Sequence, residues 1–170
     1  MPRTALFALL LASSLAATGI VVEAQDPRPA FSAFPVKSIY RGKSAPPRIT
    51  AEQRAFGTHI RTGARAPVQF AGHYTVALFG CGTECSMFYI IDAISGTVYD
   101  GFAFVELPTG WIERQKGPLL PRIAFHPNSR LLKINGCLNE RDCGFYDYLM
   151  LEGSGLKLIR KQLLPQAFQY

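Results

Sequence analysis

The feature that most constrains the fold of this chain is residues 69–99, where short apolar runs alternate with turn signals. Residues 70–79 contain no Lys, Arg, Asp or Glu and are rich in aromatic and β-branched side chains, which favour strands. Successive side chains of a strand point to opposite faces, and neither set here is strongly polar, so we expect a central strand covered on both faces. The turn sequence GCGTEC, a second apolar run at 87–91 and the turn sequence DAISG follow. The stretch therefore predicts three strands joined by two turns.

Turn signals recur up to the C-terminus at a spacing of roughly 8–12 residues, which is typical of antiparallel β-domains. A further strand is expected to begin at Trp111. The other expected strands lie at 102–107, 122–125, 131–135, 145–151 and 156–164.

A single helix is predicted. It begins at Thr50, where Gln53 stands at the spacing of a capping box, and it ends at Gly63. The sequence therefore predicts a mainly β fold: an antiparallel β-sandwich, or a curved sheet or barrel, with one short N-terminal helix.

The N-terminus has the composition of a secretory signal peptide, with Arg3, an apolar run at 5–22 and a small-residue cleavage site. Cleavage before Gln25 would remove 24 of the 170 residues and leave 146. A membrane anchor is the alternative, but small polar residues interrupt the apolar run, and no second long apolar run follows. We expect a periplasmic or secreted protein without a transmembrane segment in the mature chain. Its expected parts are a signal peptide (1–24), an extended Pro-rich lead-in with one short edge strand (25–49) and a single β-rich domain (50–170).

Positive charge is concentrated in residues 25–70, which hold eight basic and two acidic residues, whereas residues 71–170 hold nine of each. The basic residues are Arg28, Lys37, Arg41, Lys43, Arg48, Arg54, Arg61 and Arg65. Such a segment can meet an anionic partner, such as lipopolysaccharide, an anionic cell-wall polymer or an acidic protein, or it can be a solvated face. Nucleic acid is not expected as a partner, because no basic-aromatic stacking pattern is present.

Four cysteines, Cys81, Cys85, Cys137 and Cys143, predict a disulfide framework in an exported protein. Three pairings are open. We favour Cys81–Cys85 and Cys137–Cys143, because each pair brackets a turn between two strands that must lie close together. Loops this short stabilise the fold by only about 2 kcal/mol each, so the expected effect is mainly to fix the shape of two turns.

Other chemistry of the cysteines has weaker support. Zinc would need His73 beside thiolates, which an oxidising compartment disfavours. A nucleophilic cysteine would need a free thiol with His73 or His59 as its base. Asp142-Cys143-Gly144 resembles the Asp-Cys of secreted cell-wall cysteine peptidases, in which the cysteine begins a helix, whereas a strand is expected here. His73 itself is expected to be a buried histidine satisfied by its neighbours. We therefore predict no metal, no cofactor and no catalytic residue.

The candidate binding residues are polar side chains in the two cysteine-bracketed loops. Glu84 is the one charge between Cys81 and Cys85. The other loop is expected to expose Asn139, Glu140, Arg141 and Asp142.

FAGHY, GCGTEC and DAISG, in this order between residues 70 and 96, resemble a pattern in small exported bacterial proteins of unknown activity. The resemblance covers roughly the middle third of the chain and implies bacterial export. In size, compartment, charge and disulfide-pinned β structure, the chain is also similar in style to periplasmic lysozyme inhibitors, although none of their motifs matches residue by residue.

These features predict an exported, non-enzymatic β-domain that binds an envelope macromolecule or protein through its disulfide-pinned loops, in the manner of an inhibitor. The alternatives are a cell-envelope hydrolase with a Cys–His site and a structural envelope protein.

Overall fold

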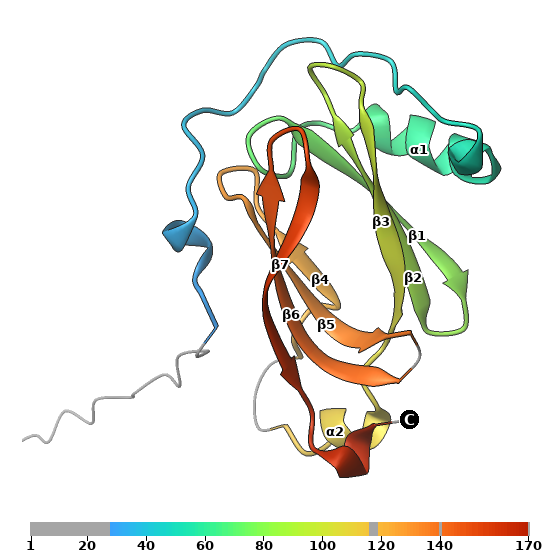
Figure 1. Ribbon diagram of the computed structural model, residues 1–170, viewed down its shortest axis with the longest axis vertical. Helices are drawn as coiled ribbons and strands as arrows, with labels where there is room; N and C mark the ends of the chain where they lie inside the picture. Colours follow the sequence, from blue (N-terminus) through green and yellow to red (C-terminus); the bar gives the residue numbers. More distant parts are fainter. Residues whose placement is uncertain (1–27, 116–118, 140, 170) are drawn as a thin grey trace, which may run out of the picture.

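Seven strands form one antiparallel sheet in the order β1-β2-β3-β5-β6-β7, with β4 pairing beside β3 on the same edge of β5 (Figure 1). The computed structural model describes residues 28–115, 119–139 and 141–169. The sheet is open, because β1 and β7 are its two ends. The predicted fold class, mainly antiparallel β in a curved sheet, is confirmed. The strands are β1 (Tyr74–Gly82), β2 (Cys85–Asp92), β3 (Val98–Val105), β4 (Ile123–Phe125), β5 (Leu131–Leu138), β6 (Asp142–Leu151) and β7 (Gly155–Leu163).

The sheet bends where β3 meets β5, because only two residue pairs join these strands, Phe104 with Leu138 and Val105 with Cys137. The rest of that edge of β5 pairs with β4. Gly136 lies at the bend, and a Cβ atom there would overlap the carbonyl oxygen of Val105. The absence of a side chain therefore lets β3 approach β5 closely.

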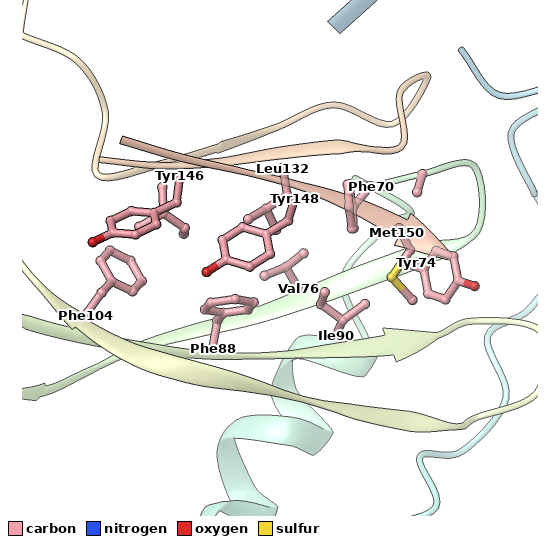
Figure 2. Close-up of a cluster of buried hydrophobic side chains, with 12 residues drawn as sticks. Phe70, Tyr74, Val76, Phe88, Ile90, Phe104, Leu132, Tyr146, Tyr148 and Met150 are labelled. Carbon is pink, nitrogen blue, oxygen red and sulfur yellow. The ribbon is translucent and has the colours of Figure 1, made fainter. Parts of the chain in front are cut away.

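The bend folds the sheet into two layers, β1–β3 and β4–β7, with the main core between them (Figure 1). Figure 2 shows Phe88 and Ile90 of β2 facing Tyr148 and Met150 of β6. The buried members of this core are Phe70, Ala71, Tyr74, Val76, Phe88, Ile90, Phe104, Leu132, Ile134, Tyr146, Tyr148 and Met150.

The predicted helix is present as a 3₁₀ turn, η2 (Glu52–Phe56), that continues into α1 (Gly57–Ala64). The expected capping box is only half formed. The backbone N–H of Thr50 donates to Oε1 of Gln53 over 3.1 Å, but the helix begins at Glu52, its N-cap is Ala51, and no side chain caps it. Ile60 and Ala64 of α1 pack with Ala77, Tyr89 and Ile91 on the outer face of β1 and β2.

Three local predictions are wrong. The strand expected to be central is β1, and it lies at one end of the sheet, where β2 is its one neighbour among the described strands. Gly63 does not end the helix: it lies inside α1, and the Cα of Ala77 is 2.7 Å from the position that a Cβ of Gly63 would occupy. No strand begins at Trp111. The carbonyl of Pro108 instead accepts hydrogen bonds from the backbone N–H groups of Trp111 and Ile112, which forms a one-turn helix, α2 (Thr109–Ile112).

Residues 28–49, here called the strap, run extended across the ends of several strands (Figure 1). The strap contains a 3₁₀ turn, η1 (Phe31–Ala33). The expected edge strand is not formed, and the strap instead makes two isolated bridges, Pro35 with Ser129 and Arg48 with Thr97. Its backbone N–H groups donate to turns of the β-domain: Val36 to Asn128, Tyr40 to Gly72, Ala45 to Ala93 and Arg48 to Gly96. The predicted signal peptide and its cleavage before Gln25 lie outside the described residues.

A buried ion pair holds the start of the strap on the outer face of β6. Arg28 is 7% exposed and Asp147 is 0% exposed. The Nη2 and Nε atoms of Arg28 donate to Oδ1 of Asp147 over 2.5 and 3.0 Å, and Nη1 donates to Asn135 on β5. The other oxygen of Asp147 lies 3.5 Å from the guanidinium of Arg160.

Candidate functional site

Both predicted disulfides are present, Cys81–Cys85 in the β1–β2 turn and Cys137–Cys143 in the β5–β6 turn. None of the four cysteines has a free thiol. The favoured pairing is therefore confirmed.

The register of the sheet brings the two disulfides to the same end of the molecule. Gly82 pairs with Cys85, Cys85 with Val105, Val105 with Cys137, and Cys137 with Cys143, so they form one row across the strands. Because neighbouring strands lie about 4.8 Å apart, Cys85 and Cys137 are separated by roughly 10 Å. We call residues 81–85, 137–139 and 141–143 the disulfide end.

The first turn of the disulfide end holds Glu84 in the left-handed region, at φ 58°. Its side chain is exposed, and its carbonyl oxygen accepts hydrogen bonds from the N–H of Glu106 and from Nη1 of Arg122, each over 3.2 Å. Nη2 of Arg122 in turn lies 2.5 Å from Oε2 of Glu106. The turn is thus fixed both by its disulfide and by an arginine from the loop before β4.

The second turn holds Asn139 in the left-handed region, at φ 52°. Asn139 and Arg141 are exposed, whereas Asp142 is half-buried and forms an ion pair with Lys161 of β7 over 2.7 Å. The predicted site residue Glu140 lies outside the described residues. Glu84, Asn139 and Arg141 are therefore the candidate residues with exposed side chains, and Asp142 is engaged within the fold.

A small apolar cluster packs against the disulfide of the second turn. Cys137 and Cys143 are both 0% exposed and pack with Leu164, Trp111 and Phe168. The side chain of Gln169 bonds both the N–H and the carbonyl of Cys143, over 2.8 and 3.0 Å. The second disulfide is thus part of a core, whereas Cys81 of the first is exposed.

Tyr146 lies beside the second turn, and its hydroxyl donates to the carbonyl of Asp142. Burial of the ring raises the pKa of Tyr146 above its ordinary value, and the nearby charge of Asp142 raises it further. Tyr146 therefore stays protonated, as a donor, across the physiological pH range.

The structure does not bring a histidine to the cysteines. His73 precedes β1, whereas Cys81 lies near the other end of that nine-residue strand, roughly 25 Å away along an extended chain. His73 is half-buried against Tyr74, with Nε2 4.0 Å from Asp92, and His59 stacks on Phe79.

Sequence analysis missed five residues that shape the disulfide end: Glu106, Arg122, Tyr146, Lys161 and Gln169. Each lies outside the cysteine-bracketed segments, and no local pattern marks it. Only the folded arrangement of the strands places it there.

The predicted basic segment divides in the structure. Arg28 is buried in its ion pair, and the other seven side chains are exposed. They are Lys37, Arg41, Lys43, Arg48, Arg54, Arg61 and Arg65.

Comparison with protein-family models, with curated proteins and with solved structures finds no match for this chain. The resemblance to small exported bacterial proteins therefore stays a prediction. Within the described residues, no helix is long and apolar enough to cross a membrane. In the same part of the chain, no group of three or more His, Cys, Asp or Glu side chains is arranged to hold a metal ion.

Proposed function

We propose that the protein is an exported, non-enzymatic binding domain that recognises a protein of the cell envelope through the disulfide end. One observation carries the proposal: two disulfide-closed turns stand in one row of the sheet, and each holds a residue with an exposed side chain in a left-handed conformation. Asparagine adopts this conformation readily in turns, whereas glutamate avoids it unless its surroundings enforce it. The strain is therefore at Glu84, and such strain is concentrated at functional sites.

Rigid turns favour recognition because the backbone of the loop is already ordered and loses little entropy on binding. Glu84 and Arg141 carry opposite charges and are both exposed. A surface with both signs of charge suits a protein partner with complementary charges better than a polymer of one sign. An inhibitor-like role is supported by these two properties, rigid turns and charges of both signs, because both favour binding to the surface of another protein.

Export is supported by the two disulfides, which are compatible with an oxidising compartment, and by the signal-like N-terminal sequence. A hydrolase with a Cys–His site would need a thiol, and each of the four cysteines is bonded to another. A structural envelope protein would have no partner that depends on the disulfide end.

The proposal is tested by capture of partners from an envelope extract with three immobilised proteins. These are the wild type, the variant Glu84→Ala/Arg141→Ala, and a control, Glu152→Ala/Lys157→Ala. The control removes the same two charges from exposed positions at the β6–β7 turn, away from the disulfide end. We expect a partner that the wild type and the control recover equally and that the first variant recovers at least about tenfold less, equivalent to 1.4 kcal/mol. Equal recovery of every partner by all three proteins would remove the disulfide end as the binding site and favour the structural role.

A further inference from the structure

A hollow of about 510 Å³ lies between the strap and α1, away from the disulfide end. This volume is within the range of small-molecule sites, roughly 300–1,000 Å³. The strap contributes Lys43, Ser44, Pro46 and Pro47 to its wall, and α1 and the residue after it contribute Arg61 and Arg65. We call this hollow the strap cleft.

The wall of the strap cleft is cationic. Lys43, Arg61 and Arg65 are exposed, no acidic residue lines the cleft, and none of the three cations has a side-chain ion pair within the described part of the chain. Arg61 and Arg65 stand four residues apart on a helix, where like charges repel each other by roughly 0.2–0.5 kcal/mol. The negative end of the helix dipole offsets this repulsion, but it does not explain why the strap adds Lys43 to the same hollow.

Both walls of the strap cleft are fixed in place. On the strap side, the N–H of Ala45 donates to Ala93 over 2.8 Å and the N–H of Arg48 donates to Gly96 over 2.7 Å. The carbonyl of Pro46 is so close to Gly96 that a Cβ atom there would overlap it. On the helix side, Gly63 packs directly on Ala77. The cations are therefore carried by a preformed hollow and not by a free tail.

We propose that the strap cleft binds a phosphate group, carried by a soluble phosphate ester or by a phospholipid headgroup. Guanidinium groups pair with phosphate oxygens through parallel N–H···O bonds, and three cations balance the charge of a phosphate monoester, about −1.5 to −2, better than the single charge of a carboxylate. Arg61 and Arg65 match phosphate geometry with paired N–H donors, and Lys43 adds a third positive charge. Pro46 and Pro47 offer an apolar wall to the organic part of the ligand. This function is independent of the disulfide end.

The proposal is tested by calorimetric titration of the full mature protein with glycerol phosphate, inorganic pyrophosphate and sodium acetate. Sedimentation with vesicles of phosphatidylcholine, with and without phosphatidylglycerol, forms a separate arm. The test variant is Arg61→Ala/Arg65→Ala. The control is Arg41→Ala/Arg54→Ala, which removes two exposed arginines of the same basic segment that do not line the cleft.

We expect at least one phosphate probe to bind at least about tenfold more weakly to the test variant than to the wild type or the control. Binding of a soluble probe assigns a soluble ester as the ligand, and binding of anionic vesicles alone assigns a headgroup. The proposal is overturned if no phosphate probe binds the wild type, if acetate binds as tightly as the phosphate probes, or if the control variant loses as much affinity as the test variant. Partner capture through the disulfide end should be unchanged in the Arg61→Ala/Arg65→Ala variant, so the two proposals can fail separately.

Discussion

At the scale of single residues, the most consequential contact is the ion pair between Arg28 and Asp147. Burial of two charges costs several kcal/mol per ion, and their attraction offsets this cost only when further hydrogen bonds complete the site. Here Asn135 accepts from Arg28, and Arg160 lies 3.5 Å from the second oxygen of Asp147. The pair is therefore well satisfied, and loss of one partner would leave the other charge buried.

We predict that Asp147→Asn lowers the free energy of unfolding by about 3 kcal/mol, because it leaves the buried guanidinium of Arg28 without a counter-charge. Urea denaturation measures this value. The matched control is Asp142→Asn, which breaks the ion pair with Lys161. The side chain of Lys161 is 39% exposed and that of Asp142 is 46% exposed. That change should cost less than about 1 kcal/mol. Equal losses in the two variants would contradict the account of Arg28 and Asp147.

The sequence could not have predicted this pair. The sequence shows Arg28 only as one of the basic residues of the N-terminal segment. Its partner, Asp147, lies 119 residues further along the chain, beyond the reach of any local pattern. Local interactions were predictable: in DAISG, Oδ1 of Asp92 accepts the N–H of Ile94 over 2.8 Å, and Gly96 has a φ of 76°. The cysteine pairing was predictable for the same reason, since each pair closes one turn.

At the scale of elements, α1 shows that glycine can have two roles, to end a helix or to allow close packing. Glycine is expected at the end of a helix, where its conformational freedom helps to stop it. Gly63 instead lies within α1, because the helix packs so closely on Ala77 that a side chain would not fit. The capping pattern predicted the helix but placed its start at Thr50, two residues before Glu52, and the packing of Gly63 depends on a strand that lies outside the local pattern.

We predict that Gly63→Ala destabilises the protein by about 1–2 kcal/mol. Alanine is favoured over glycine within a helix by about 1 kcal/mol, but its Cβ would overlap Ala77, and overpacking costs typically 1–3 kcal/mol or more. Thermal and urea unfolding measure the change.

Two further variants separate these effects. Thr62→Ala, at an exposed position of the same helix, should be neutral or stabilising. Addition of Ala77→Gly to Gly63→Ala should restore little of the lost stability, because it removes the Cβ of Ala77 but leaves the backbone Cα and N of residue 77 at 2.7 and 3.0 Å from the added Cβ. If Gly63→Ala alone raises stability, the close packing of α1 on β1 is not a constraint.

At the scale of the whole molecule, the two-layer core contains the buried tyrosines Tyr74, Tyr146 and Tyr148. Burial raises the pKa of Tyr74, Tyr146 and Tyr148 above the ordinary value. The spacing of turn signals predicted an antiparallel sandwich, curved sheet or barrel, but neither the place of β1 at one end of the sheet nor the bend at Val105 and Cys137. That bend depends on β3 and β4 sharing one edge of β5, which only the complete set of strand pairings decides.

We predict that stability declines as the pH rises above about 10, the ordinary pKa of tyrosine. Above this pH the unfolded chain loses its tyrosine protons, while the folded chain keeps those of the buried rings. The unfolded state then binds fewer protons, so the free energy of unfolding falls with increasing pH. Urea midpoints measured on either side of about pH 10 should show this slope, and Tyr148→Phe should reduce it. An equal slope in wild type and variant would show that Tyr148 does not contribute.

The strap also determines the order in which the fold can be completed. Synthesis proceeds from the N-terminus, so Arg28 is made 119 residues before Asp147, the residue that buries its charge. Until β5 and β6 have been made, the start of the strap has no surface on which to lie. Completion of the domain therefore waits until β6 has been made.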